Sequence, residues 1–387
     1  MSSSFPRLVA AQEEFVKPPS REITTISFIQ LTGGIVIIRA TIGQFPDTLN
    51  FVLDTGSSGI SLDSSTAEFL GLHPTPTDRT IRGIAGIKTV SFLYNQQLHF
   101  PGLTIDSLNF HVNDYSLLTA VYGEQIDGII GYSVLSRYIL KVNYDSLHIT
   151  FCSQGPIRYP RGGFMLRPAI NQLVAQPVRV RDASSVGTRF LYDMGAGVCM
   201  LLSREFVEDS EFLDKRKKTW TKEGEGLGGK LDMQLRVLKE IRLGPYKFRN
   251  IPVFVFEDAN NVTNYPYMGG ILGNDILRRF NVIINYEKSE FYLTPNSHFN
   301  SPFDYSYSGL ELYMINGMII AGDVAKGSPA EAAGIKEGDE IIAVNKNFAQ
   351  NLDAYKVALQ TPNERVKIII RRNGELKEIE FKVKSIL

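Results

Sequence analysis

The feature that most constrains this chain is an internal duplication. The stretch "FVLDTGSSGISL", which contains Asp54, has a relative in "FLYDMGAGVCML", which contains Asp193. Three further pairs follow in the same order: "RGIAGIK" with "EGLGGKL", "DGIIGYSVLSRY" with "GGILGNDILRRF", and "VNYDSLHITF" with "INYEKSEFYL". The closing glycines of the third pair, Gly131 and Gly273, lie 77 (131 − 54) and 80 (273 − 193) residues beyond the two aspartates. Four blocks in one order at similar offsets predict two similar lobes.

The lobes are predicted to be mainly β. Short runs rich in Val, Ile, Phe and Tyr are bounded by Gly, Pro, Asn and Asp, which is typical of strands and turns. After "NSHFNSPFDYSYS" the pattern changes to strands mixed with short helical segments. The predicted organisation is an N-terminal extension (1–22), lobe 1 (23–154), lobe 2 (155–295), a linker (296–304) and a small α/β domain (305–387).

Charge and hydropathy exclude several classes of function. The 387 residues carry 41 basic and 41 acidic side chains, so no electrostatic footprint for nucleic acid is present. The densest basic run, "DKRKKTW", is interpreted as a solvated loop or helix end. No apolar stretch approaches the roughly 20 residues needed to span a bilayer, and the N-terminus lacks a proper signal-peptide pattern. Cys152 and Cys199 predict neither a disulfide framework nor a metal site, and no cofactor is expected.

Each lobe has a strand that ends on a carboxylate among small residues. Burying a carboxylate is costly unless donors surround it, so Asp54 is either a turn-capping residue or a functional one. Two carboxylates that share one proton can activate water and protonate a leaving amine, because close like charges cannot both ionise. The repeat favours this reading for Asp54 and Asp193, one from each lobe.

The two lobes resemble aspartic proteases. The D-T-G-S-S-G motif resembles the N-terminal lobe of pepsin-like enzymes, whereas the Gly-rich segments and the "GIIG" and "GILG" blocks look more like retroviral proteases. The resemblance implies a bilobal double β-barrel in which Asp54 is the ionised base and Asp193 the protonated acid. It implies support of this pair by Thr55, Gly56, Ser57, Met194, Gly195 and Ala196. It implies flaps at Gly83, Ile84, Ala85 and Gly86, and at Gly226, Leu227, Gly228 and Gly229.

The second lobe departs from the family pattern. Met194 stands where lobe 1 has Thr55, and Ala196 stands where lobe 1 has Ser57. The Thr55 hydroxyl is expected to cross the lobe junction, and the Ser57 hydroxyl is expected to contact ionised Asp54. Loss of the second hydroxyl suits a protonated Asp193, but it also fits a decayed lobe. The flaps have a plain alternative as ordinary Gly-rich hairpins.

The C-terminal segment resembles a PDZ domain through "GSPAEAAGIKEGDEIIAVN". The resemblance implies a carboxylate-binding loop at Ser308, Gly309, Leu310, Glu311 and Leu312, although Glu311 is atypical there. Its backbone N–H groups would hold a C-terminal carboxylate while the peptide adds as a strand. The alternative is a domain that packs on the lobes and binds no free peptide.

The sequence therefore predicts an aspartic endopeptidase that cleaves peptides or unfolded protein, with a PDZ domain that binds protein C-termini. The rival is a catalytically degenerate peptide-binding or scaffold protein. An extracytoplasmic, periplasmic or secreted location is expected only by analogy with other proteases that carry PDZ domains. Cleavage specificity and oligomeric state are not predicted.

Overall fold

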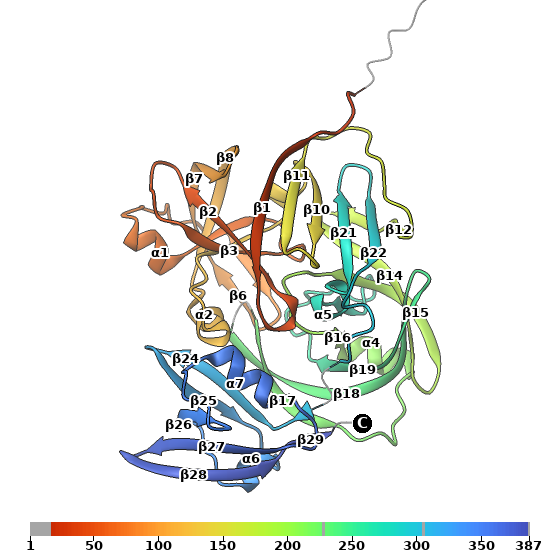
Figure 1. Ribbon diagram of the computed structural model, residues 1–387. Helices are drawn as coiled ribbons and strands as arrows, with labels where there is room; N and C mark the ends of the chain where they lie inside the picture. The colour runs from red at the N-terminus through yellow and green to blue at the C-terminus, as the bar shows by residue number, and fades with distance from the viewer. Residues whose placement is uncertain (1–16, 227–228, 304–305, 386–387) are drawn as a thin grey trace, which may run out of the picture.

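The computed structural model describes residues 17–226, 229–303 and 306–385, and it confirms the mainly β fold class with two lobes and a small C-terminal domain (Figure 1). Most of the predicted N-terminal extension, residues 1–16, lies outside the described residues. None of the described helices is long and apolar enough to cross a membrane.

Lobe 1 carries the first copy of the repeat. Its elements are β1 (Glu22–Gln30), η1 (Thr32–Gly34), β2 (Val36–Ile42), β3 (Leu49–Leu53), β4 (Ile60–Asp63), α1 (Ser64–Phe69), β5 (Thr80–Gly83), β6 (Gly86–Thr89), β7 (Ser91–Phe100), β8 (Leu103–Asn113), α2 (Ser116–Tyr122), β9 (Gly128–Ile130), α3 (Tyr132–Leu135), β10 (Ile139–Asn143) and β11 (His148–Cys152).

Lobe 2 repeats this order from β14 onward. Its elements are β12 (Phe164–Leu166), β13 (Ala169–Asn171), β14 (Leu173–Arg181), β15 (Ser185–Tyr192), β16 (Met200–Ser203), α4 (Arg204–Ser210), β17 (Trp220–Gly226), β18 (Gly229–Leu243), β19 (Tyr246–Phe256), β20 (Gly270–Leu272), α5 (Asn274–Leu277), β21 (Phe280–Asn285) and β22 (Glu290–Pro295).

Strand pairing shows the same motif in both lobes. In lobe 1, β3 pairs in parallel with β9, and β4 pairs antiparallel with β9 and parallel with β8. In lobe 2, β15 pairs in parallel with β20, and β16 pairs antiparallel with β20 and parallel with β19. A helix follows each equivalent strand: the Asp63 carboxylate caps α1 and the Ser203 hydroxyl caps α4. The repeated blocks of sequence thus form repeated structure.

The lobes join through a shared sheet. Strand β10 pairs antiparallel with β21, so the strands that close the two repeats lie side by side. One hydrophobic cluster runs through both lobes from Ile26 to Phe303, and the buried side chains include Phe51, Phe110 and Phe190. Burial of such aromatic side chains gives about 1.5–3 kcal/mol each. The loops that follow β3 and β15 are therefore anchored to a common core.

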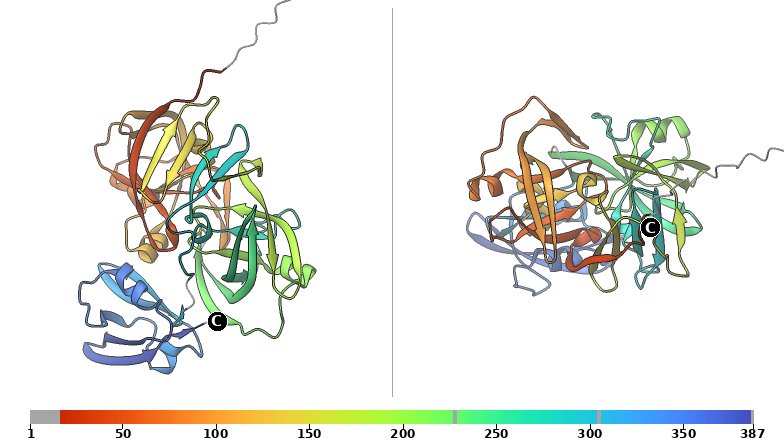
Figure 2. Two further views of the ribbon diagram at one scale, coloured as in Figure 1. Left: turned by 45° about the vertical axis from the view of Figure 1, so that its right-hand side comes forward. Right: turned by 90° about the horizontal axis from the view of Figure 1, so that it is seen from above.

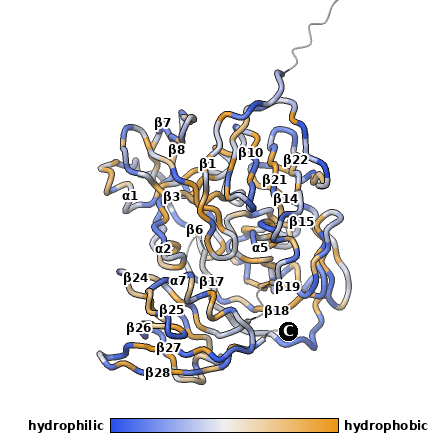
Figure 3. Tube along the Cα trace, in the orientation of Figure 1, coloured by the Kyte–Doolittle hydropathy of each residue, from blue (hydrophilic) through white to orange (hydrophobic). Residues whose placement is uncertain are grey.

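The C-terminal domain has its own core. Its elements are β23 (Ser306–Tyr307), β24 (Leu310–Ile315), β25 (Met318–Val324), α6 (Pro329–Ala332), β26 (Glu340–Val344), α7 (Leu352–Ala358), β27 (Arg365–Arg372), β28 (Glu375–Lys382) and β29 (Lys384–Ser385). Along β27, Val366, Ile368 and Ile370 are buried at alternate positions, the pattern of a strand with one face on a core. Figure 3 shows hydrophobic and hydrophilic residues intermixed along the strands of this domain. The five-stranded sheet runs in the order β24-β25-β26-β27-β28, so β24 is an edge strand.

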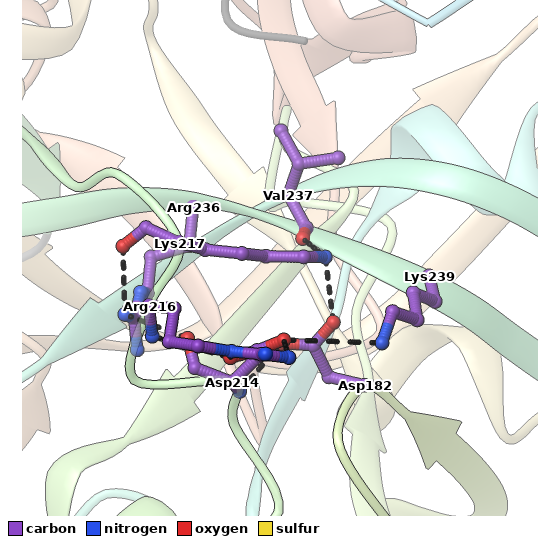
Figure 4. Close-up of polar contacts among 7 residues, drawn as sticks. All are labelled: Asp182, Asp214, Arg216, Lys217, Arg236, Val237 and Lys239. Atoms are coloured by element: carbon purple, nitrogen blue, oxygen red, sulfur yellow. Dashed lines mark hydrogen bonds and ion pairs between the residues drawn. The ribbon is translucent and has the colours of Figure 1, made fainter.

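The basic run of lobe 2 is not simply solvated. Lys217 donates to the buried Asp182 carboxylate at 2.6 Å and to the Val237 carbonyl at 2.7 Å (Figure 4). Asp182 also accepts from the Asp214 backbone N–H at 2.8 Å. The interpretation as a solvated loop was wrong for Lys217, because its ammonium group binds the buried Asp182 carboxylate just after β14 and the Val237 carbonyl of β18.

Candidate active site

Two equivalent loops meet at the junction of the lobes. Asp54 follows β3, and its backbone N–H donates to the Ile130 carbonyl at 3.0 Å. Asp193 follows β15, and its backbone N–H donates to the Leu272 carbonyl, also at 3.0 Å. The "GIIG" and "GILG" blocks therefore support the two aspartates from behind through backbone hydrogen bonds.

The two aspartates are half-buried, and their carboxyl groups are hydrogen-bonded to each other. Each also accepts a backbone N–H from its own loop: Gly56 donates to Asp54 Oδ1 and Gly195 donates to Asp193 Oδ1, both at 2.7 Å. The pair formed by Asp54 and Asp193 is called the dyad below. Carboxyl groups in direct hydrogen-bond contact share a proton when one of them is ionised.

Glycine is required at the positions that face the dyad. A Cβ atom added at Gly56 would lie 2.5 Å from Asp193 Cγ, and one added at Gly195 would lie 2.5 Å from Asp54 Cγ. Each loop therefore presses its backbone against the carboxyl group of the opposite lobe. Any side chain there would push the carboxyl groups apart.

A side-chain hydroxyl bridges the lobes at Thr55 of lobe 1 but not at the equivalent position of lobe 2. The Thr55 hydroxyl donates to the Tyr192 carbonyl at 2.7 Å and accepts from the Met194 backbone N–H at 3.0 Å. Thr55 is fully buried. Met194, at the equivalent position of lobe 2, is also fully buried and belongs to the common hydrophobic core. The reciprocal hydroxyl contact is thus replaced by apolar packing.

Thr55→Val should destabilise the protein by about 2–4 kcal/mol, because it leaves a buried carbonyl and a buried N–H unpaired. Thr55→Ser keeps the hydroxyl and should cost less. Urea unfolding of the two variants measures the difference. Equal losses in free energy of unfolding would mean that the hydroxyl bonds do not hold the lobes.

Burial raises the pKa of both dyad residues, but to different extents. Desolvation raises the pKa of Asp54, while its hydrogen bonds from Asp193 and from two backbone groups oppose the rise. The pKa of Asp193 lies well above the ordinary 3.8, because of desolvation first and then the charge of Asp54. Raised pKa values on two carboxyl groups in contact are the behaviour of a pair that shares one proton.

The contact predicted for the Ser57 hydroxyl is made by the backbone instead. The Ser57 backbone N–H interacts with Asp54, and the Ala196 backbone N–H interacts in the same way with Asp193. The two loops therefore make equivalent backbone contacts with their aspartates, and the difference between serine and alanine does not change these contacts.

A raised carboxyl pKa predicts how stability changes with pH. The folded state binds more protons than the unfolded state between the unfolded pKa, 3.8, and the folded pKa, so the free energy of unfolding falls as pH rises through that window. Asp193→Asn should remove this loss. We expect its Tm to exceed that of wild type at neutral pH, by about 2–4 °C per kcal/mol gained.

The measurement is Tm against pH for wild type, Asp193→Asn and the exposed control Asp47→Asn. Parallel curves for all three proteins would show that the dyad does not bind a proton with a raised pKa.

The first predicted flap is a short hairpin formed by β5 and β6, with Gly83 paired to Gly86. It reaches across the junction, because the Ile84 carbonyl accepts from Asn260 Nδ2 at 3.3 Å. The Ile84 side chain joins a hydrophobic cluster with Ala196 beside the dyad. Ala85 lies in the turn between the two strands. This hairpin thus lies over the lobe-2 side of the site.

The second predicted flap is the hairpin of β17 and β18, whose outermost described pair is Gly226 with Gly229. Leu227 and Gly228 lie outside the described residues. Sequence reasoning assigned this hairpin to the lobes alone and missed its contact with the C-terminal domain. The Lys230 ammonium lies 4.8 Å from the centre of the Tyr313 ring and donates to the Gly322 carbonyl at 3.4 Å.

The predicted carboxylate loop lines a cavity of 420 Å³. Ser308, Gly309, Leu310 and Glu311 form one wall, and Val198 and Phe254 of lobe 2 are among the residues opposite. Leu312 is buried in the core of the C-terminal domain. Gly309 has φ +70°, and a Cβ there would lie 2.1 Å from Ser328 Cβ. The loop conformation thus depends on glycine.

A lobe-bridging residue near the dyad was missed. Asn274 Nδ2 donates to the Gly34 carbonyl at 2.5 Å, and Asn274 Oδ1 accepts from the Tyr144 hydroxyl at 3.0 Å. Asn274 is completely buried. The signal in the sequence was the difference between "GYS" and "GND" within otherwise matching blocks.

Comparison with known families agrees with this arrangement of two lobes around paired aspartates. The family model described as aspartyl protease matches residues 38–134 and 176–276, about half of the chain. A PDZ domain model matches residues 320–372. The protein is a protease-family chain with a C-terminal PDZ domain. It belongs to the aspartyl protease family.

Two similar proteins share only a short segment with it. One, from Chlamydia muridarum, is named probable periplasmic serine endoprotease DegP-like and is 37% identical over 78 residues, 20% of this chain and 16% of that protein. The other, from Bacillus subtilis, is named carboxy-terminal processing protease CtpB and is 34% identical over 91 residues, 22% of this chain and 19% of that protein. The matches thus span less than a fifth of either relative.

Proposed function

We propose that this protein is a single-chain aspartic endopeptidase that hydrolyses peptide bonds in peptides or unfolded proteins. The observation that carries the proposal is the half-buried, hydrogen-bonded pair of carboxyl groups, each approached closely by a glycine of the opposite lobe. Such a pair provides a general base and a general acid at one point.

The proposed reaction uses the dyad in two steps. A water oxygen attacks the scissile carbonyl carbon while Asp54 accepts the water proton and Asp193 donates its proton to the carbonyl oxygen. The product is a neutral gem-diol. Asp54 then donates its proton to the amine nitrogen as the C–N bond breaks, and a gem-diol hydroxyl returns a proton to Asp193. Both residues end in their starting states.

A serine mechanism is the competing proposal, because one relative is named a serine endoprotease. A serine nucleophile needs a base within hydrogen-bond reach. In the described part of the chain, no histidine ring is hydrogen-bonded to a serine hydroxyl; His99 pairs with Thr104 and His148 with a backbone carbonyl. The shared 78-residue segment is also shorter than either lobe. Both points favour the dyad.

The test is inhibition of peptide hydrolysis by two reagents. A statine-containing peptide, which mimics the gem-diol, should inhibit, and a fluorophosphonate, which reacts with serine nucleophiles, should neither inhibit nor label the chain. The opposite pattern would exclude the aspartic mechanism. If the protein binds peptides but hydrolyses none, the result would favour the degenerate binding protein. Methionine at position 194, where lobe 1 has Thr55, is compatible with that alternative.

The same proposal assigns peptide C-termini to the PDZ domain and an extracytoplasmic location to the protein. The loop at residues 308–312 borders a cavity of 420 Å³ beside an edge strand, which suits capture of a carboxylate with strand addition. The location is supported by the word periplasmic in a relative's name. No nucleic acid partner is proposed.

A further inference from the structure

The PDZ domain is docked on both lobes in this structure (Figures 1 and 2). From lobe 1, the Val121 carbonyl accepts from Lys356 Nζ at 2.5 Å, and the Thr32 hydroxyl bonds to the Asp353 carboxylate. From lobe 2, the Thr221 carbonyl accepts from the Tyr307 hydroxyl at 3.0 Å. Together with the Lys230 contacts, these bonds fix the domain against both sides of the junction.

The lobe-1 contacts fall on the peptide groove of the domain. The groove is bounded by the edge strand β24 and by α7, which pack against each other. Helix α2 of lobe 1 packs directly against β24. The Val121 carbonyl of α2 accepts from Lys356 of α7, and a Cβ placed on Gly123 would lie 3.2 Å from Leu352 Cβ. Helix α2 thus contacts both walls of the groove (Figure 1).

The end of the groove at the carboxylate loop remains open as a cavity. The cavity of 420 Å³ is lined by Ser308 and Gly309 on one side and by Lys356 of α7 and the following Leu359 on another. There is therefore room for the last residue of a peptide, while α2 stands where the preceding residues would pair with β24.

We propose that α2 occupies the PDZ groove in cis, so that a peptide with a free C-terminal carboxylate binds only by displacing α2 and undocking the domain. A peptide adds to a sheet edge through main-chain hydrogen bonds, and α2 lies at that edge. Peptide and α2 therefore compete, and the apparent affinity is reduced by the fraction of molecules that are docked. The inference rests on the proposed function only in treating the tail as a peptide-binding domain.

Undocking also changes the lobe-2 hairpin. Lys230 would lose its contacts with Tyr313 and Gly322, and Thr221 would lose its bond from Tyr307. These residues lie on β17 and β18, the stems of the second predicted flap. Capture of a C-terminus thus releases a hairpin beside the dyad, and the two sites are coupled.

A reversible cross-link tests the competition. The distance of 3.2 Å at Gly123 and Leu352 is close to the ~3.5–4.5 Å that a disulfide needs between Cβ atoms. The full chain carrying Gly123→Cys, Leu352→Cys and Asp54→Asn would be compared oxidised and reduced, because Asp54→Asn prevents cleavage of the probe. The probe is a fluorescent hexapeptide pool randomised at its last three positions, as free acid and as C-terminal amide.

Reduction should tighten binding of the acid pool by about tenfold or more, and the amide should bind weakly in both states. The chain with Asp54→Asn alone, whose Cys152 and Cys199 are both buried, controls for effects of the oxidant. Equal affinity of the oxidised and reduced forms would overturn the proposal, as would the absence of binding in both.

A second variant covers failure of the cross-link to form. Thr32→Val, made together with Asp54→Asn so that the probe is not cleaved, removes the bond to Asp353 without changing any residue of the PDZ domain, so it should tighten binding of the acid pool. In the same protein, adding the peptide should speed amide hydrogen exchange in residues 220–226 and 229–243. Unchanged affinity together with unchanged exchange would contradict the proposal. Neither readout requires hydrolysis, so failure here is distinct from failure of the aspartic mechanism.

Discussion

Asp54→Asn and Asp193→Asn should each lower kcat/KM for a short peptide by about a thousandfold or more, and the double variant should be no worse than either single one. The two carboxyl groups act as a unit, so the loss of one already abolishes their joint contribution to the rate, and loss of the second causes no further decrease. An asparagine amide in place of the Asp54 carboxylate cannot accept the water proton, and one in place of the Asp193 carboxyl cannot supply a proton to the carbonyl oxygen.

The control is Asp47→Asn, an exposed aspartate outside the site, which should retain wild-type kcat/KM. Retention of wild-type activity by Asp193→Asn would remove the paired-carboxylate mechanism, whereas additive losses would mean that the two residues act independently.

Gly195→Ala should lower kcat/KM by about a hundredfold or more while the chain still folds. The new methyl group would begin 2.5 Å from Asp54 Cγ, and no side chain can approach a carboxyl carbon so closely. Either the Asp54 carboxyl or the Gly195 loop must move, and a displacement of about 1 Å in a catalytic group costs about 10² in rate.

Gly187→Ala is the matched control, because Gly187 lies on β15, the strand that leads to Asp193, and an added Cβ there would meet only the Val178 carbonyl, at 4.0 Å. It should keep full activity. Equal activity of the two alanine variants would show that the close approach at Gly195 does not position the dyad.

The sequence predicted the parts of the site that depend on local pattern. Asp54 and Asp193 could be paired because each ends an apolar run and begins a glycine turn, and the repeat placed them in equivalent positions. Tight turns demand glycine whatever surrounds them, so the loops around the dyad were readable from composition and spacing.

The contacts between distant segments could not be read in this way. The end of helix α2 and the start of α7 in the groove are 230 residues apart in sequence (352 − 122). The sequence pattern of neither segment indicates that the two are in contact. Lys217 likewise looked solvated within its own run, since Asp182 lies far from it in sequence. The Ser57 prediction assigned a hydroxyl to a position where the backbone N–H makes the contact.

The most direct test of the account is the pH dependence of kcat/KM for one short peptide in the wild-type protein, from about pH 3 to about pH 9. The account predicts a bell-shaped profile whose two limbs belong to the dyad as a pair, with the alkaline limb well above the ordinary aspartate pKa of 3.8 because Asp193 holds its proton. A profile with a single limb that rises through about 6.5, the ordinary pKa of histidine, to a plateau would contradict it.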